Sequence, residues 1–462
     1  MKNLKNKLKE IPILKKTWDK FKLRIKRIQQ IEAMGSIKAI KSGNLKRGTY
    51  YALNHIVNRN DYLRQLSLAH DLALANIQSK ANSERVKIAF QTSFLSTWIG
   101  DEIVKLFLSD DRYDVTIVLV WQTNSSKEKE LKLLYEHFSK MNVKTIFADG
   151  SVHPGDFDIV IYTSPYIEAL DKWGMKDIPL STLVCHIPYG IYIAELQNMQ
   201  FNDYIHNINW RNYAASDYYI GVADKYCGIG SYGMKFSGYP KLDPVYKKGY
   251  ANKNIWKCKG DINKAKKIIY APHHSLNVIP FYSTFDQNMN FVYEYAKLHP
   301  ESTSWVFKPH PLLRVNAVKS GLFESEEKFD EYIDKWRKLP NATVEEGEYL
   351  SIMASSDAMI LDSVSFMAEY LYYNKPILFL TRKGEKMNEF GKQLLTVLYN
   401  CPGDDLPGVE SFIENTINGN DFMKQDRELF YEKYLNYYGK NGVLASEYIY
   451  NDITASIFSN SQ

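Results

Sequence analysis

The sequence predicts an α/β fold made of two doubly wound, Rossmann-like halves. Short apolar runs alternate with helical stretches from Val86 onward, which is typical of a mainly parallel sheet. The alternation stops over residues 224–264, which are rich in Gly, Lys, Tyr and Pro, and it then resumes. A chain of 462 residues is also too long for one ordinary hydrophobic core. Two domains are therefore expected.

The expected strands are short and rich in β-branched or aromatic side chains, as buried parallel strands are. In the first half they are expected at 86–90, 115–120, 143–147, 159–162, 182–185 and 218–222. In the second half they are expected at 267–271, 305–308, 342–344, 358–361 and 377–380. Helices are expected between strands, for example at 99–108 and 127–141, and Tyr- and Leu-rich helices close the chain over about 421–458. Two such halves facing one another across a cleft form a GT-B-like architecture.

The expected domain boundaries follow from these changes of pattern. Residues 1–84 form a basic, amphipathic helical extension. Residues 85–235 form an N-terminal Rossmann-like domain, and residues 236–462 form a C-terminal Rossmann-like domain with closing helices.

Composition indicates a soluble globular protein, with 45% apolar and 24% charged residues. The four cysteines lie far apart without a Cys-x-x-Cys pair, so we expect neither a zinc site nor a disulfide framework, and a reducing compartment. The sequence contains no run of about 18 apolar residues and no signal-peptide core at its N-terminus. We therefore expect a cytoplasmic protein that does not span a membrane.

Basic charge is concentrated at the N-terminus. Residues 1–50 contain 15 Lys and Arg against 3 Asp and Glu, a net of +12, and the remainder carries 43 against 50, a net of −7. An apolar stripe at spacings of three and four runs along residues 14–28 and includes Trp18 and Phe21. The other sides of this helix carry basic residues, among them Lys15, Lys16, Lys22 and Arg24.

Such a helix can lie in the interface of an anionic membrane, where each lysine contributes about 1 kcal/mol near the surface. The alternative is a helix whose stripe packs on the rest of the protein while its lysines are solvated. Nucleic acid is a third possible partner, but no aromatic and basic platform recurs elsewhere in the chain. We expect peripheral attachment to the inner face of the cell membrane and no nucleic-acid partner.

The stretch 359–380 indicates a β-strand, a polar turn, a helix and a second strand. It sets Asp362, Ser363 and Ser365 between the end of a strand and the first turn of a helix. Backbone N–H groups and the helix dipole favour an anion there, and nucleotides bind at this edge of open α/β sheets. Glu369 lies one turn further, where a carboxylate can accept from ribose hydroxyls. An ordinary Ser N-cap without any ligand is the alternative.

Three histidine-containing segments also follow expected strands. His186 comes directly after one strand and is the best general-base candidate, because an imidazole titrates near neutral pH. His273 follows another strand. Lys308 ends a third strand and His310 comes just after it; a Lys and a His there suit the binding of phosphate or the protonation of a leaving phosphate. The alternatives are a buried, backbone-bonded His186 and a capping role for His273.

No metal or other cofactor is expected. Asp156-Phe-Asp158 matches an Asp-x-Asp metal motif, but it precedes an apolar strand instead of following one, so we interpret it as a solvated turn. A histidine pair at 273–274 has no carboxylate cluster or His-Glu-x-x-His motif beside it.

Taken together, these segments resemble the CDP-glycerol glycerophosphotransferase family of teichoic-acid primases and polymerases. Gly238-Tyr-Pro-Lys-Leu-Asp243 is similar to that family's Gly-Tyr-Pro-Arg-Asn-Asp, and Tyr270-Ala-Pro-His-His is similar to its Tyr-Ala-Pro-Thr-Trp. Lys308-Pro-His-Pro311 resembles Lys-x-His-Pro, and Asp362-Ser-Val-Ser365 resembles Asp-Tyr-Ser-Ser. On the acceptor side, Cys185-His-Ile-Pro-Tyr-Gly190 replaces the family's Trp-His-Gly-Thr-Pro.

The resemblance implies a GT-B transferase that needs no metal and attaches to the inner membrane face. It places the acceptor in the N-terminal domain, with His186 deprotonating the acceptor hydroxyl. It places the CDP-activated donor in the C-terminal domain, with Ser363 and Ser365 on phosphate, Glu369 on ribose, and His310 stabilising or protonating the leaving phosphate.

The expected reaction moves a glycerol-phosphate unit, or a related alditol- or sugar-phosphate, to a hydroxyl of a glycan or lipid-linked acceptor. Teichoic acid, capsule and lipopolysaccharide are the polymers considered. A GT-B glycosyltransferase that uses a nucleotide sugar is the alternative enzyme. A non-catalytic scaffold is a third hypothesis. It is disfavoured by the presence together of His186, Lys308, His310 and Ser365.

Overall fold

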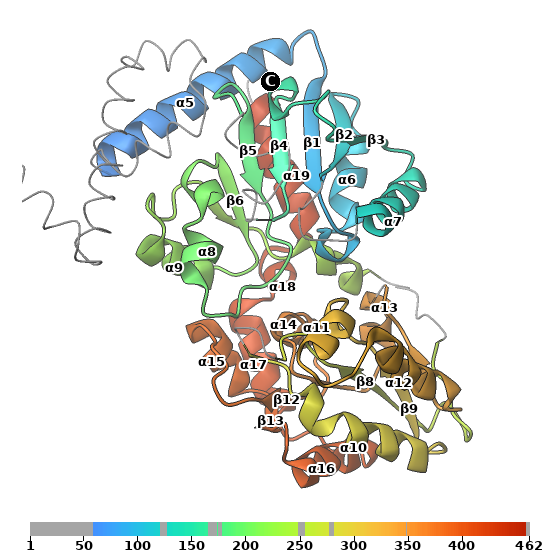
Figure 1. Cartoon of the computed structure of the whole chain (residues 1–462). Helices are drawn as coiled ribbons and strands as arrows, with labels where there is room; N and C mark the ends of the chain where they lie inside the picture. Colours follow the sequence, from blue (N-terminus) through green and yellow to red (C-terminus); the bar gives the residue numbers. More distant parts are fainter. Residues whose placement is uncertain are drawn as a thin grey trace, which may run out of the picture. The chain divides into compact units, whose positions relative to one another are not determined.

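The chain divides into two compact units (Figure 1). A computed structural model describes residues 59–120, 127–164, 173, 178–247, 255–276, 281–347 and 349–458. Unit 1 comprises residues 1–189, 198–237 and 446–462, and unit 2 comprises residues 190–197 and 238–445. Each unit is built on its own parallel sheet, as expected for an α/β fold.

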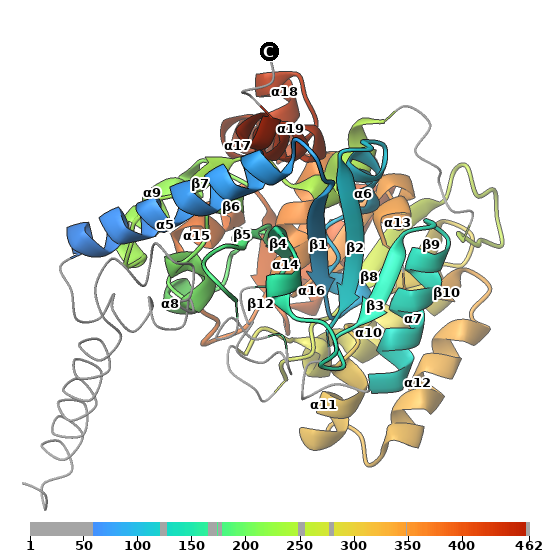
Figure 2. The same cartoon turned by 90° about the horizontal axis from the view of Figure 1, so that it is seen from above.

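The sheet of unit 1 has seven parallel strands in the order β3-β2-β1-β4-β5-β6-β7. The strands are β1 (Val86–Thr92), β2 (Tyr113–Leu119), β3 (Lys144–Phe147), β4 (Ile159–Tyr162), β5 (Leu183–His186), β6 (Arg211–Ala214) and β7 (Met234–Phe236). Figure 2 shows β1, β2 and β3 side by side, with α7 next to β3. The first six strands follow the doubly wound order 3-2-1-4-5-6, so the strand order reverses between β1 and β4.

Helices cover the sheet of unit 1, and both of its faces are apolar. They are α5 (Arg59–Lys80), α6 (Asp101–Leu108), α7 (Lys127–Ser139), α8 (Gln197–Phe201), α9 (Tyr218–Tyr226) and α19 (Ala445–Phe458). Ile449, Ile453 and Ile457 of α19 recur every four residues and join Ala73 and Ile77 of α5 in one apolar cluster. Helices from the two ends of the described chain therefore pack on the same core (Figure 1).

The sheet of unit 2 has six parallel strands in the order β10-β9-β8-β11-β12-β13. They are β8 (Lys266–Ala271), β9 (Thr303–Phe307), β10 (Ala342–Val344), β11 (Ala358–Leu361), β12 (Ile377–Thr381) and β13 (Tyr399–Pro402). This is again the order 3-2-1-4-5-6, with the reversal between β8 and β11. The polar segments 272–276 and 362–365 directly follow these two strands.

The helices of unit 2 are amphipathic. They are α10 (Phe285–Leu298), α11 (Leu313–Lys319), α12 (Glu326–Lys338), α13 (Leu350–Ser355), α14 (Val364–Glu369), α15 (Glu389–Leu395), α16 (Leu406–Ile417), α17 (Lys424–Tyr434) and α18 (Tyr437–Asn441). In α12 the Ser325 side chain caps the first turn, and the buried Phe329, Tyr332, Ile333 and Trp336 form one helical stripe. That stripe packs into the same core as β8 and β9.

Most expected strands are confirmed to within a few residues, but the expectation of a strand at 218–222 is wrong. Those residues form α9, whose buried Tyr219 and Ala223 lie four residues apart on one helix face. Local β-branched and aromatic composition favoured a strand, whereas packing of that face favours the helix. β6 before α9, β7 after it and the final β13 were not expected.

The division into units differs from the expected boundaries at the C-terminus. The expected second domain ran to residue 462, but α19 packs in the core of unit 1. Asp158 of the Asp-x-Asp motif accepts from the Lys80 ammonium at 3.0 Å and from the Lys87 backbone at 2.8 Å. Asp158 is therefore largely buried and held in an ion pair, and the expectation of a solvated turn is wrong for this residue.

None of the described helices is both long enough and apolar enough to cross a membrane. Residues 1–58 lie outside the described part of the chain, so the expectations for Lys15, Lys16, Trp18, Phe21, Lys22 and Arg24 fall outside it as well.

Candidate active site

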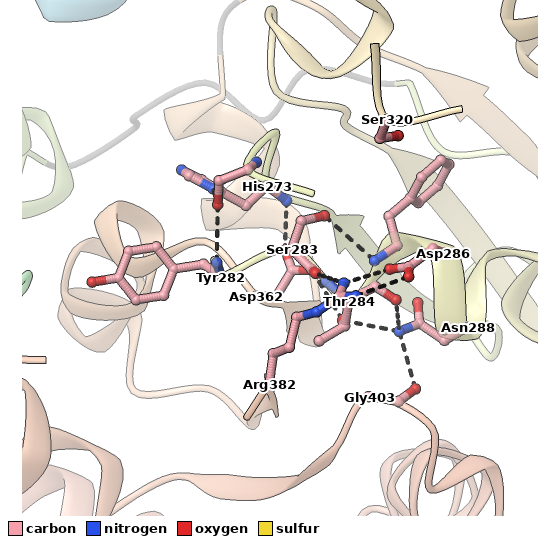
Figure 3. A network of polar contacts seen from close by, with 12 residues as sticks. His273, Tyr282, Ser283, Thr284, Asp286, Asn288, Ser320, Asp362, Arg382 and Gly403 are labelled. Carbon is pink, nitrogen blue, oxygen red and sulfur yellow. Dashed lines mark hydrogen bonds and ion pairs between the residues drawn. The ribbon is translucent and has the colours of Figure 1, made fainter. Parts of the chain in front are cut away.

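Asp362 forms the centre of a polar network at the carboxyl end of β11 (Figure 3). Its side chain is buried, at 1% exposure. Oδ1 accepts from the backbone N–H of His273 at 2.5 Å. Oδ2 accepts from the backbone N–H of Thr284 at 2.5 Å and from its hydroxyl at 3.0 Å. The carboxylate therefore joins the segment after β8 to the first turn of α10.

This geometry gives Asp362 a positioning role. Burial raises the pKa of the carboxyl group to about 7, and the hydrogen bonds from Thr284 and His273 offset part of that shift. Both oxygens of the carboxylate already accept from N–H and O–H groups of unit 2, so the carboxylate can affect a bound phosphate group through the position of His273. In direct contact, the negative carboxylate would repel the phosphate.

Three imidazole rings meet next to this network, and we call His273, His274 and His310 the histidine cluster. Ring centroids are 4.3 Å apart for His273 and His274, 5.3 Å for His273 and His310, and 4.2 Å for His274 and His310. One nitrogen from each ring lies within 4.8 Å of a nitrogen of the other two. The rings come from the carboxyl ends of β8 and β9, which are neighbours in the sheet.

Hydrogen bonds define the tautomer of each ring in the cluster. His310 Nδ1 accepts from the backbone N–H of Leu312 at 3.1 Å. His274 Nδ1 accepts from the side-chain amide of Asn316 at 2.9 Å. His273 Nδ1 accepts from the Ser275 backbone at 3.3 Å and faces the Ser275 hydroxyl at 2.8 Å. A neutral ring that accepts at Nδ1 carries its proton on Nε2.

The cluster is uncharged at neutral pH. Burial is the main cause that lowers the pKa of all three rings, and it lowers the pKa of His310 to about 3. His274 and His310 lower the pKa of His273 further, and His274 and Lys308 do the same for His310. In this state each ring carries its one N–H on Nε2.

These donors suit an anion better than a metal ion. A histidine that binds a metal through Nε2 normally donates its Nδ1–H to a carboxylate or carbonyl. In the cluster each Nδ1 instead accepts from an N–H group, so the Nε2 lone pair that a metal would need is protonated. A phosphate group accepts hydrogen bonds from N–H donors without any change of tautomer.

Lys308 lies beside the cluster at the end of β9. Its side chain is 7% exposed, and its ammonium donates to the carbonyl of Gly347 at 3.0 Å. The same ammonium lies 5.7 Å from the centre of the Tyr349 ring. Its positive charge lowers the pKa of His310, so a cation lies near that ring of the cluster.

Ser363 and Ser365 lie at the start of α14, as expected. Ser363 is the N-cap residue with extended backbone, and its side chain makes no capping hydrogen bond to α14. Ser365 is exposed. Both hydroxyls remain candidates for phosphate contacts at the same sheet edge as the histidine cluster.

Glu369 lies in a different environment from the one expected of a ribose contact. It is 3% exposed, and its two oxygens accept from the hydroxyls of Tyr239 at 3.2 Å and Tyr349 at 2.6 Å. Burial raises its pKa, which the nearby Lys241 ammonium and the two hydroxyls partly offset. Lys241 also lies over the Tyr349 ring, at 5.0 Å. Glu369 therefore anchors the Gly-Tyr-Pro-Lys segment inside unit 2.

His186 ends β5 in unit 1 and is fully buried, at 0% exposure. Its Nδ1 lies 3.1 Å from the side-chain oxygen Oδ1 of Asn212, which can only accept, so Nδ1 carries the proton. Nε2 then has a free lone pair, and it has no hydrogen-bond partner among the described residues. Burial lowers the pKa of His186 to about 3, so the ring is neutral at pH 7.

The structure thus brings together His273, Lys308, His310 and Asp362 at one edge of unit 2, with Ser363 beside them. Reasoning from the sequence missed Thr284, Asn316 and Asn212, which hold the expected residues in place. No local motif marks these three positions, because their partners lie 78, 42 and 26 residues away.

Two Rossmann-like units with parallel sheets define a GT-B-like α/β fold. The wall teichoic acid polymerase TagF has a similar fold, with a TM-score of 0.51 and 13% identity over 90% of this chain and 99% of that one. A TagF variant soaked with CDPG gives a TM-score of 0.51 and 12% identity over 90% and 98%. UDP-GlcNAc 2-epimerase from Neisseria meningitidis gives a TM-score of 0.46 and 13% identity over 80% and 99%. No curated protein matches the chain.

The model of the CDP-glycerol:poly(glycerophosphate) glycerophosphotransferase family matches residues 179–455, more than half of the chain. The chain belongs to this family, and it is an enzyme. The matched range contains His186 in unit 1 and the whole histidine cluster in unit 2.

Proposed function

We propose that this enzyme transfers a glycerol-phosphate unit from CDP-glycerol to a hydroxyl of a membrane-associated glycan or lipid-linked acceptor in teichoic acid synthesis. Family membership supports the donor and the transferred group. The observation that carries the proposal is the histidine cluster beside Lys308 at the β8 and β9 edge. Three N–H donors and an ammonium suit the diphosphate of such a donor.

In the proposed reaction the acceptor oxygen attacks the β-phosphorus of the donor. A new phosphorus–oxygen bond forms, the bond to the bridging oxygen breaks, and CMP leaves with that oxygen and its electron pair. The proton of the acceptor hydroxyl passes to a base. Charge gathers on the departing phosphate, where prearranged hydrogen-bond donors stabilise it most effectively.

We assign the base to His186. Its Nδ1–H donates to Asn212, which leaves Nε2 as the acceptor for a hydroxyl proton. A buried nitrogen without a partner costs stability, and the acceptor hydroxyl supplies the missing hydrogen bond. For Glu369 we propose an indirect effect on the donor through Tyr239 and Tyr349, because both of its oxygens already accept from their hydroxyls.

We also propose that residues 14–28 attach the enzyme to anionic lipid at the inner membrane face. The net charge of +12 over residues 1–50 and the apolar stripe that includes Trp18 and Phe21 support this proposal.

Ligand-dependent thermal unfolding tests the donor assignment. A ligand at about a hundredfold excess over its Kd stabilises the folded state by about 2.7 kcal/mol. CDP-glycerol is expected to raise the unfolding temperature in the presence of EDTA, and CDP is expected to raise it more than UDP or GDP does. A preference for UDP or GDP would instead indicate a nucleotide-sugar transferase, and no response to any of the nucleotides would contradict the donor assignment.

A further inference from the structure

The chemical state of the histidine cluster is set by the groups that surround it. Leu312 N–H, Ser275 N–H and the Asn316 amide each point to the Nδ1 atom of one ring. An imidazolium carries protons on both nitrogens, so charging a ring would bring its Nδ1–H against a donor. For His310 that donor is a backbone N–H at 3.1 Å, which cannot reverse its polarity.

The charged groups around the cluster do not favour an imidazolium either. Lys308 adds a positive charge beside His310. The carboxylate of Asp362 faces the backbone of His273, not its ring, and Tyr282 presents its ring to His273 at 5.7 Å. Arg382 is paired with Asp286 nearby. Among the described residues, no carboxylate makes a hydrogen bond or ion pair with any of the three rings.

We propose that His273, His274 and His310 bind the donor diphosphate through three neutral Nε2–H groups, so that the nucleoside monophosphate departs without taking a proton from the protein. This inference rests on the proposed function for the identity of the ligand. It replaces general-acid catalysis by His310 with hydrogen bonding from a neutral imidazole.

The chemistry of the departing group allows this. The bridging oxygen leaves with the electron pair of the broken phosphorus–oxygen bond and becomes an oxygen of the monophosphate. The second ionisation of a phosphate monoester has a pKa of about 6, so the dianion is the stable product at neutral pH. A neutral imidazole can stabilise the developing charge by donating a hydrogen bond, as a neutral histidine does in other enzyme active sites.

Nitrogen NMR of the full-length enzyme with ¹⁵N-labelled histidine tests the inference directly, because the two ring nitrogens resonate apart according to which one is protonated. Signals are assigned by single His→Gln variants. The three cluster rings are expected in the Nε2–H form from pH 6.5 to 8, both alone and with saturating pyrophosphate or CDP-glycerol. His299 provides an internal reference of opposite tautomer, because its Nδ1 donates to the Tyr295 carbonyl at 2.9 Å.

An imidazolium signal from His310 on addition of either ligand would overturn the inference. So would a metal-bound shift of the cluster signals when zinc is added to EDTA-treated protein, together with zinc-dependent binding of pyrophosphate. If pyrophosphate binds with unchanged tautomers but CDP-glycerol does not bind, the inference holds and the proposed donor is wrong. If CDP-glycerol binds and His310 becomes charged, the donor is right and the inference is wrong.

Asn316→Asp gives a second test that reverses one tautomer. A carboxylate at this position accepts from Nδ1–H of His274, which removes the proton from Nε2. It also loses the hydrogen bond that the Asn316 amide donates to the His274 carbonyl at 3.1 Å, so circular dichroism and thermal unfolding check that the variant stays folded. Pyrophosphate is expected to bind about tenfold more weakly, the effect of losing one hydrogen bond to a charged group. Asn420→Asp adds the same charge at an exposed site of unit 2 and is expected to bind pyrophosphate normally. Equal affinities for the two variants would contradict the role of His274.

Discussion

Asp362 and Thr284 are joined by two hydrogen bonds to one carboxylate oxygen, from the Thr284 backbone at 2.5 Å and from its hydroxyl at 3.0 Å. This contact places the first turn of α10 against the end of β11 (Figure 3). The other oxygen of Asp362 holds the backbone of His273. One buried carboxylate thus organises the edge of the sheet at which the histidine cluster lies.

Asp362→Asn is expected to destabilise the protein. The amide replaces one acceptor oxygen with an NH₂ group that faces N–H or O–H donors, and a buried donor left without an acceptor costs about 1–3 kcal/mol. Urea unfolding measures the change. Asp334→Asn, at an exposed site, is expected to change stability by less than about 0.5 kcal/mol. Similar values for the two variants would show that the network contributes little.

His310→Gln is expected to slow turnover with CDP-glycerol by about 10²–10³, as loss of one prearranged donor to a developing charge typically does. His299→Gln, in the same unit but outside the cluster, is expected to retain wild-type turnover. Steady-state CMP release measures both. Full activity of the His310 variant would remove this residue from the reaction.

His186→Gln is expected to lower kcat by about 10²–10⁴ because a general base is lost, while donor binding in unit 2 is unchanged. Comparison of kcat with the Kd for CDP-glycerol measures this separation. A loss of donor affinity equal to the loss of kcat would contradict the assignment of His186 to the acceptor. His137→Gln serves as a control, since that half-buried histidine pairs with Asp101 elsewhere in unit 1.

Stability is expected to fall as the pH is lowered from about 6.5 towards 4. Burial lowers the pKa of His186 and His310 to about 3 and also lowers the pKa of His206, His273 and His274. Below the unfolded pKa of about 6.5, the unfolded chain binds protons at these histidines that the folded protein does not bind. The free energy of unfolding therefore falls by up to about 1.4 kcal/mol per pH unit for each ring.

Asp362 acts in the opposite direction. Its folded pKa of about 7 lies above its unfolded value of 3.8, so between these values the folded protein holds a proton that the unfolded chain releases. Burial raises the pKa of Glu369 and Glu385 as well, so these two carboxyl groups act in the same direction as Asp362. The five histidines outnumber the three carboxyl groups. Urea unfolding between pH 4.5 and 7.5 measures the slope, and His274→Gln is expected to reduce it. Stability that increased on acidification would contradict the neutral state of these rings.

Deletion of residues 1–35 is expected to release the protein from anionic vesicles and to leave turnover on a soluble acceptor analogue unchanged. The deleted segment contains most of the basic charge and the apolar stripe. Sedimentation with vesicles of anionic and of neutral lipid measures the binding. Undiminished sedimentation of the shortened protein with anionic vesicles would assign the attachment to another part of the chain.

The sequence predicted the fold well where strands are buried on both faces. β4 and β11 read as continuous apolar runs, and the structure places every residue of both in the interior. β13 was missed because it is an edge strand in which half-buried and exposed residues alternate. α9 was wrongly predicted as a strand because its aromatic and β-branched residues favour strands. The packing of its buried face depends on residues distant in the sequence, which a local pattern does not include.

The sequence predicted where the residues of the candidate site would lie, but not which residues they would contact. Strand ends indicated where His186, His273, His310 and Asp362 would lie, since ligands bind at this edge of parallel sheets. The contacts of Asp362 with Thr284 and of His274 with Asn316 depend on how distant segments meet. The roles of Asp362 and Glu369 changed for this reason: their carboxylates accept from groups of the protein itself.

Transfer of label from CDP-glycerol that carries ³²P at the β-phosphorus tests the central claim most directly. The phosphotransferase account predicts that the label appears in the acceptor and that unlabelled CMP is released, in equal amounts. Label retained in CDP, with unlabelled acceptor product, would show that the bond on the other side of the β-phosphate is cleaved and would contradict the account.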